Sequence, residues 1–181
     1  MWDRIALLLG YLANLTTDDK VRNFAVIIGV GVAVQSILTA RAIARKKQSA
    51  DLLFASRGDP KLQGGYAQVN LHHGAEGQGI RSLAEPESKG SDEAMQVRFL
   101  LNHWELLSIG IQSGIYDERM VKKSWYSAVT DTYVRARPFI LRSREVDKKS
   151  TLFQEFEWLA ERWLASPLEQ HARIRWYEFW K

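Results

Sequence analysis

The sequence predicts an all-α protein with a single N-terminal transmembrane helix, a Gly-rich linker and a small helical bundle. Three observations lead to this fold class. Residues 24–40 are uncharged and lack proline, residues 58–90 hold 7 of the chain's 12 glycines, and beyond residue 91 apolar side chains recur every three or four positions. No segment has the alternation of apolar and polar residues that is typical of a strand.

The apolar run can be extended through residues 41–44, because an arginine at a helix end can reach the membrane interface. The segment 24–44 would form about 32 Å of helix at about 1.5 Å per residue, enough to cross a hydrocarbon core of about 30 Å. A buried core helix is the alternative, but apolar residues cover every face instead of one stripe. A cleaved signal peptide is disfavoured, because cations follow the run.

Four cations form a basic cluster on the C-terminal flank of this segment: Arg41, Arg45, Lys46 and Lys47. They predict contact between the protein and the anionic headgroups of a lipid bilayer. The N-terminal flank has three cations, and cytoplasmic flanks are enriched in Lys and Arg. The expected location is therefore the inner (cytoplasmic) membrane, single-pass, with the N-terminus outside and the C-terminal domain cytoplasmic.

Composition divides the rest of the chain into four segments. Their expected roles are an N-terminal apolar segment in the membrane interface (1–23), a basic juxtamembrane helix (45–57), the Gly-rich linker (58–91) and a helical domain (92–181). Trp2 and Tyr11 favour the interfacial position, although a second crossing would make the anchor a two-helix hairpin.

Capping residues predict four helices within the helical domain. Ser91 and Asp117 are the expected N-caps of the first two, and the second should end before Pro138. Ser150 should cap the third, and Ser166-Pro-Leu-Glu is a capping box that opens a last helix. The expected core residues are Val97, Leu100, Trp104, Leu107, Ile111, Val121, Trp125, Ala128, Thr132, Ala136, Leu152, Phe156, Leu159, Trp163, Leu168, Ala172, Trp176 and Phe179.

Composition also excludes some kinds of chemistry. The chain has no cysteine, so disulfides, thiolate zinc sites and cysteine nucleophiles are excluded. The net charge of +4 arises within residues 1–50, which argues against nucleic acid as a partner. The basic stretch 119–149 is expected to pair with Glu155, Glu157 and Glu161, with anionic lipid as the alternative.

The best candidate site is a polar group on the first helix of the domain. Asn102 and Glu105 are three positions apart on one face, and Arg98 lies a turn earlier. A buried Glu105 would need a cation, which Arg137 or Arg142 could supply. A structural network is the favoured interpretation, and a ligand-binding or acid/base carboxylate is the alternative. No catalytic residue is assigned.

No metal or cofactor is expected. His72, His73 and Glu76 carry metal-binding atoms but lack the spacing of a defined site. The glycines at 74–79 lack the Lys-Ser/Thr ending and the preceding strand of a phosphate-binding loop.

Three stretches resemble a known family. They are Arg98-Phe-Leu-Leu-Asn-His-Trp-Glu-Leu-Leu-Ser-Ile-Gly-Ile with Gly114-Ile-Tyr-Asp, then Arg137-Pro-Phe-Ile, then Phe153-Gln-Glu-Phe-Glu-Trp-Leu. Over residues 92–165 the chain resembles the bacterial domain of unknown function numbered 4760. The resemblance implies a membrane-anchored N-terminus, a small helical domain and an origin in bacterial genomes and mobile elements. It implies no activity, substrate or catalytic residue.

The favoured function is therefore a protein-interaction or regulatory module tethered at the cytoplasmic face, with a protein partner and without enzymatic activity. One alternative is a membrane-tethered enzyme that uses Glu105 and Asn102 on a small or lipid-derived substrate. The other is a defence or exclusion protein of a mobile element, which rests only on the setting that the resemblance implies.

Overall fold

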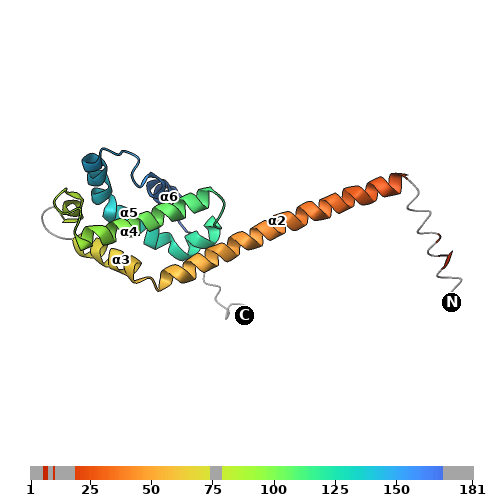
Figure 1. Ribbon diagram of the computed structural model, residues 1–181, viewed down its shortest axis with the longest axis horizontal. Coiled ribbons are helices and arrows are strands. Elements are labelled where there is room, and N and C mark those ends of the chain that lie inside the picture. The colour runs from red at the N-terminus through yellow and green to blue at the C-terminus, as the bar shows by residue number, and fades with distance from the viewer. Residues whose placement is uncertain (1–5, 8–9, 11–18, 74–78, 169–181) are drawn as a thin grey trace, which may run out of the picture. The chain divides into compact units, whose positions relative to one another are not determined.

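The computed structural model describes residues 6–7, 10, 19–73 and 79–168 (Figure 1). Its main elements are α2 (Asp19–Arg57), α3 (Pro60–His73), the 3-10 helix η1 (Gly79–Ala84), α4 (Asp92–Gln112), α5 (Glu118–Asp147) and α6 (Gln154–Ala165). The described residues contain no strand, which confirms the all-α class. The chain divides into two compact units, Met1–Ala44 and Arg45–Lys181.

In the second unit the helices form a bundle around α4. Helix α3 packs along α4, and α6 packs along it as well (Figure 1). Helix α5 contacts α3, η1 and α6. The last part of α2 also belongs to this unit, through the buried side chain of Ser49.

Residues 58–91 do not form the expected linker in their described part. They fold into α3 and η1, and Leu62, Val69, Ile80 and Leu83 of these helices are buried in the core. The glycines are misleading because Gly65 allows two helices to approach closely. A Cβ there would lie 2.6 Å from Leu100 Cβ and 2.7 Å from the Gln96 carbonyl oxygen. The central part of the expected linker, residues 74–78, lies outside the described residues.

The expected start and core face of the first domain helix are confirmed in α4. The Ser91 hydroxyl accepts a hydrogen bond from the backbone N–H of Ala94 (3.2 Å), as an N-cap does. All five predicted core positions of this helix are buried: Val97, Leu100, Trp104, Leu107 and Ile111. After the helix, Gly114 adopts φ 70°, a left-handed conformation that favours glycine.

The second domain helix is longer than expected. Asp117 caps α5 by accepting a hydrogen bond from the N–H of Met120 (3.0 Å), as predicted, but the helix continues through Pro138 to Asp147. A proline inside a helix cannot donate to the carbonyl four positions earlier, here that of Val134. Both residues are exposed, so water can solvate that carbonyl. Burial of the neighbouring Phe139 holds the helix in place.

The third domain helix, α6, begins later than predicted. Ser150 lies in the preceding turn, and Phe153 occupies the N-cap with φ 57° and no side-chain cap bond. The Phe153 side chain is buried, so packing outweighs the capping preference that favoured Ser150. Ser166 is the C-cap of α6. Most of the helix predicted from Ser166 to the C-terminus, residues 169–181, lies outside the described residues, as does most of the segment 1–23.

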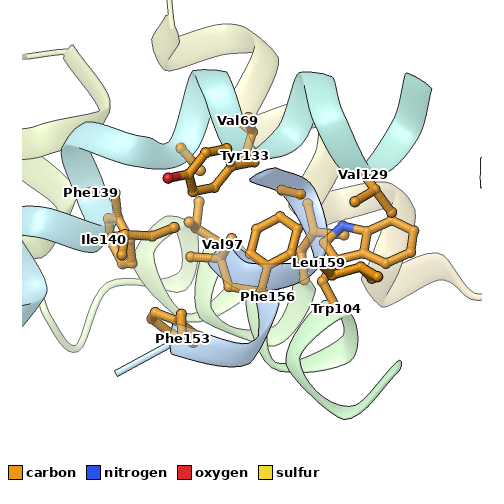
Figure 2. Packing of buried hydrophobic residues seen from close by; sticks show 14 of the residues in the cluster. Val69, Val97, Trp104, Val129, Tyr133, Phe139, Ile140, Phe153, Phe156 and Leu159 are labelled. Carbon is orange, nitrogen blue, oxygen red and sulfur yellow. The ribbon is translucent and has the colours of Figure 1, made fainter. Parts of the chain in front are cut away.

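Aromatic side chains fill the centre of the bundle (Figure 2). The rings of Trp104 and Phe156 stack with their centroids 6.4 Å apart, and Tyr133 meets Phe156 edge-on at 5.9 Å. Among the described residues, Trp104 and Trp163 are the two largest fully buried side chains. Each of these two rings therefore contributes a large apolar area to the core.

Candidate functional site

The described residues of the first unit leave the apolar stretch of α2 without cover. Ten of its large apolar side chains are at least 50% exposed: Phe24, Val26, Ile27, Ile28, Val30, Val32, Val34, Ile37, Leu38 and Ile43. Among the described residues this is the one helix long and apolar enough to cross a membrane, and none of its apolar window is buried. A core helix of a soluble protein would be mostly buried. The structure therefore gives no support to the core-helix alternative.

The basic cluster lies on the same continuous helix. Arg41, Arg45, Lys46 and Lys47 are all exposed and follow the apolar stretch without a break in α2. Their charges are concentrated within two turns of helix, because seven consecutive residues contain all four. The part of α2 that follows the apolar stretch can therefore contact a polyanionic surface.

Ser49 joins the last part of α2 to α5, a contact that the sequence analysis did not identify. Its hydroxyl accepts a hydrogen bond from the backbone N–H of Asp117 (2.7 Å) and donates one to the carbonyl of Arg45 (2.9 Å). Ser49 is fully buried and Asp117 is the N-cap of α5, so this bond ties α2 to the start of α5. The sequence feature that could have indicated this contact is the spacing of the small residue Ser49 three positions before Leu52. Leu52 also packs against the core.

A groove lies beside this junction, within the second unit. Its volume is about 420 Å³, and its walls come from the last turns of α2 and the first turns of α5. The lining residues are Ala50, Leu53, Phe54, Arg57, Met120, Ser124 and Trp125. Most of these side chains are apolar or aromatic, and Arg57 is the one cation among them. Phe54 is 73% exposed. Such a surface suits an apolar or amphipathic binding partner.

The residues predicted to form one polar group on α4 contact different partners in the structure. The Glu105 carboxylate accepts a hydrogen bond from the backbone N–H of Phe156 (2.7 Å), at the start of α6. Glu105 thus caps α6 from a neighbouring helix, in place of the missing side-chain cap at Phe153. Burial raises the pKa of Glu105, and the N–H donors of Phe156 and Glu155 oppose this only in part.

The other predicted residues lie apart from Glu105. Arg98 is 3.8 Å from the Asp147 carboxylate and lies over the Phe139 ring at 5.3 Å. Asn102 is exposed on the outer face of α4. The structure therefore does not bring Arg98, Asn102 and Glu105 into one constellation.

The two arginines expected to pair with Glu105 have other positions. Arg142 binds both carboxylate oxygens of Glu85 (2.8 and 2.7 Å) and also contacts Glu145 (2.9 Å). The bond from Arg142 lowers the pKa of Glu85. Arg137 is exposed. The expected pairing of Glu105 with Arg142 is wrong, because backbone N–H groups satisfy the Glu105 carboxylate instead.

Pairing between α5 and α6 involves residues that sequence reasoning named only as a group. Arg144 pairs with Glu157 at 2.8 Å, and the Tyr133 hydroxyl donates to the same carboxylate at 2.9 Å. Burial acts to raise the pKa of Glu157, but these hydrogen bonds outweigh it and the pKa is lowered. In α6, Arg162 pairs with Glu118 at 2.9 Å. Of the pairing expected for the basic stretch 119–149, the contact between Arg144 and Glu157 is therefore confirmed, whereas Arg162 and Glu118 lie outside that stretch.

Comparison with known proteins finds one family model that spans both the apolar stretch of α2 and most of the bundle. The family described as "Domain of unknown function (DUF4760)" matches residues 23–163. This match is wider than the resemblance over residues 92–165, because it also includes the apolar stretch of α2, α3 and η1. No curated protein and no solved structure matches the chain. Since the family match covers most of the chain, the protein belongs to the DUF4760 family.

Proposed function

We propose that the protein is a membrane-anchored interaction or regulatory module, with α2 as its anchor and the bundle at the cytoplasmic face of the inner membrane. The observation that carries the proposal is the exposed apolar stretch of α2. Each Å² of apolar surface left in water is unfavourable by about 25 cal/mol, and a bilayer removes that surface from water.

The family match supports a retained anchor. It begins at Asn23 and runs through the apolar stretch into the bundle. A leader peptide that is removed after export would not be expected inside the same family unit as the mature domain. The cations that follow the stretch also differ from the small neutral residues of a cleavage site.

The short connection favours a bundle that acts close to the bilayer. Nine positions separate Ala40, at the end of the uncharged run, from Ser49, the first buried residue of the bundle. Even fully extended, nine residues reach only about 32 Å. The partners of the bundle are therefore expected at the membrane surface, where the basic cluster can also attract anionic lipid.

Topology is the first test of the proposal. A fluorescent reporter that matures only in the cytoplasm, fused after Lys181, should fluoresce, and protease added to intact spheroplasts should leave the bundle uncut. Replacing Arg45, Lys46 and Lys47 with Gln should weaken the orientation bias, because cytoplasmic flanks are selected by Lys and Arg. Digestion of the bundle in intact spheroplasts would mean that the bundle lies outside the cytoplasm. Release of the chain by alkaline carbonate would contradict a membrane-spanning anchor.

The groove provides the test of a protein partner. Proteins that co-purify with the full chain in mild detergent should be lost with Phe54→Asp, which places a charge in the groove. They should be kept with Leu71→Asp, a matched control at a similarly exposed apolar residue on α3 that does not line the groove. Recovery of the same proteins with both variants would contradict a role for the groove.

A further inference from the structure

The outer face of α4 carries no charge over four turns. Between residues 95 and 109, the exposed residues of this helix are Met95, Phe99, Asn102, Leu106 and Ile109. The four apolar members are 38% to 68% exposed, although a solvated helix face is normally charged or polar. We name these five residues the α4 stripe.

The spacing of the α4 stripe is that of a helix-pairing seam. Its members are four, three, four and three positions apart, so they follow one line along about 21 Å of helix at about 1.5 Å per residue. The opposite face of α4 is already buried in the bundle, with Val97, Leu100 and Trp104 in the core. Helix α4 therefore has a second apolar face, and the described residues leave that face uncovered.

Asn102 indicates which occupant fits this face. Its side-chain amide both donates and accepts hydrogen bonds, so an Asn102 facing its own copy across a two-fold axis can satisfy both groups reciprocally. A lipid surface or a purely apolar partner would leave the amide buried without a hydrogen bond, which is unfavourable. A single asparagine in an apolar seam is also a known means of fixing helix register.

Charges at the two ends of the stripe favour an antiparallel arrangement. Lys61 of α3 lies 5.6 Å from the centre of the Phe99 ring, near one end. Glu155 of α6 accepts a hydrogen bond from Gln112 (2.5 Å), just beyond the other end. Asp92 lies at the same end as Lys61, so this end carries one charge of each sign, whereas the other end carries Glu155. Antiparallel pairing would bring Lys61 near the partner's Glu155, whereas parallel pairing would bring the two Glu155 carboxylates together.

We propose that the α4 stripe is a self-association surface, which pairs antiparallel with the same stripe of a second copy and places Asn102 on the two-fold axis. Met95 then lies opposite the partner's Ile109. The proposal rests on the membrane-anchored function, because a stripe of about 21 Å gives a small interface. Confinement of both copies to one bilayer raises their effective concentration.

The absence of cysteine in the natural chain allows a direct test by crosslinking. In isolated membranes under mild oxidation, Asn102→Cys should form a covalent dimer. Met95→Cys co-expressed with Ile109→Cys should also crosslink, whereas Met95→Cys alone and Asp131→Cys, at an exposed position on α5, should not. Dimers of Met95→Cys alone, or equal crosslinking by Asp131→Cys, would overturn the proposal.

A second variant tests the interface without disturbing the core. Leu106→Lys, combined with Asn102→Cys, should lower the crosslinked fraction, because weakening the interface by about 1.4 kcal/mol lowers the association constant about tenfold. Leu141→Lys on α5 is the matched control and should leave the fraction unchanged, since both leucines are exposed. Equal crosslinking with both variants would contradict the proposal.

Carbonate extraction of the same membranes distinguishes failure of the self-association proposal from failure of the anchored function. A chain that stays in the membrane without crosslinks would contradict self-association alone. A chain that is released would contradict the anchored function.

Discussion

At the scale of single residues, the hydroxyl of Ser49 makes the contact with the clearest consequence for stability. It accepts the N–H of Asp117 at 2.7 Å from a fully buried position. Ser49→Ala would leave that N–H without a partner, which should lower the free energy of unfolding by about 1–2 kcal/mol.

Urea unfolding of the full chain in detergent, followed by tryptophan fluorescence, measures this change. Ser124→Ala is the control, because the Ser124 hydroxyl is exposed and bonds only within its own helix. Its effect should stay within about 0.5 kcal/mol. Equal effects of the two variants would show that Ser49 does not tie α2 to α5.

The Glu105 carboxylate predicts a pH dependence. Burial raises its pKa in the folded protein, so ionisation opposes folding. Its stabilising contribution should be complete below the unfolded-state pKa and should decline as the pH rises through the raised folded pKa. Relative to Glu105→Gln, the wild-type chain should therefore lose free energy of unfolding as the pH rises through that window.

Glu85 provides a control of opposite sign. The hydrogen bond from Arg142 lowers the Glu85 pKa, so its contribution should be present above the unfolded-state pKa and lost as the pH falls through the folded pKa. Urea titrations of Glu105→Gln and Glu85→Gln between about pH 3 and pH 8 span the ordinary range of carboxyl pKa values and should give opposite slopes against the wild type. Slopes of the same sign would contradict the prediction, because they would mean that the N–H donors of Phe156 and Glu155 outweigh burial in setting the Glu105 pKa.

Residue identities alone could predict helix caps supplied by neighbouring residues, but not a cap supplied by a side chain from another helix. Ser91 and Asp117 act on N–H groups three positions away, so sequence spacing was sufficient to find them. Glu105 acts on Phe156, 51 positions away, and this pairing depends on how α4 and α6 pack. Asn102 was found as a polar residue on α4, but its exposure became apparent only when the packed face of the helix was known.

At the scale of elements, substitutions at two adjacent glycines of α3 can test whether this segment is a packed helix or a linker. Gly65→Ala would place a Cβ 2.6 Å from Leu100 Cβ, and should destabilise the bundle by about 1–3 kcal/mol through overpacking. At Gly64 a Cβ would approach only the flexible end of Gln96, with Oε1 at 2.8 Å. Gly64→Ala should therefore be neutral or stabilising by up to about 1 kcal/mol, as alanine favours helix.

Thermal unfolding of the two variants in parallel measures this difference. In a flexible linker both substitutions would be almost neutral, so equal midpoints for Gly64→Ala and Gly65→Ala would contradict the packing of α3 against α4. The pair also explains why the glycine content of residues 58–91 was misread. Composition cannot distinguish a glycine that loosens a chain from one that allows close helix contact.

The end of α5 was also impossible to predict from residue types alone, because the helix continues through Pro138. A proline normally ends or kinks a helix, and the preceding residue disfavours the helical region. The long continuation to Asp147 depends on burial of Phe139 and Ile140 and on the exposed face at Pro138. Neither condition is visible until the neighbouring helices are in place.

At the scale of the whole molecule, the sequence was sufficient to predict the division between an apolar helix and a bundle. Hydrophobic content that covers every face of a helix is a long-range signal, and it does not depend on tertiary detail. The extent of the bundle was underestimated, because α3 and η1 are held by contacts with α4 and α5 and carry little periodicity of their own.

The same division predicts that membrane retention and bundle stability can be lost separately. Ile28 and Val32 are 51% and 61% exposed, and neither contributes to the described core. Changing both to Arg should oppose insertion by about 5–7 kcal/mol, at about 2.5–3.5 kcal/mol for each charge near the centre of the bilayer. The chain should move to the soluble fraction while its bundle unfolds at the wild-type temperature.

The reciprocal variant should destabilise the bundle without affecting the apolar stretch. Phe156→Ala removes a fully buried ring that stacks on Trp104, and should destabilise the bundle by about 3–5 kcal/mol while the chain stays in the membrane. Ile28→Leu with Val32→Leu is the control and should change neither property. Carbonate extraction and thermal unfolding report the two outcomes independently. If the arginine pair also unfolded the bundle, the apolar stretch would contribute to the fold, and its exposed surface would no longer support an anchor.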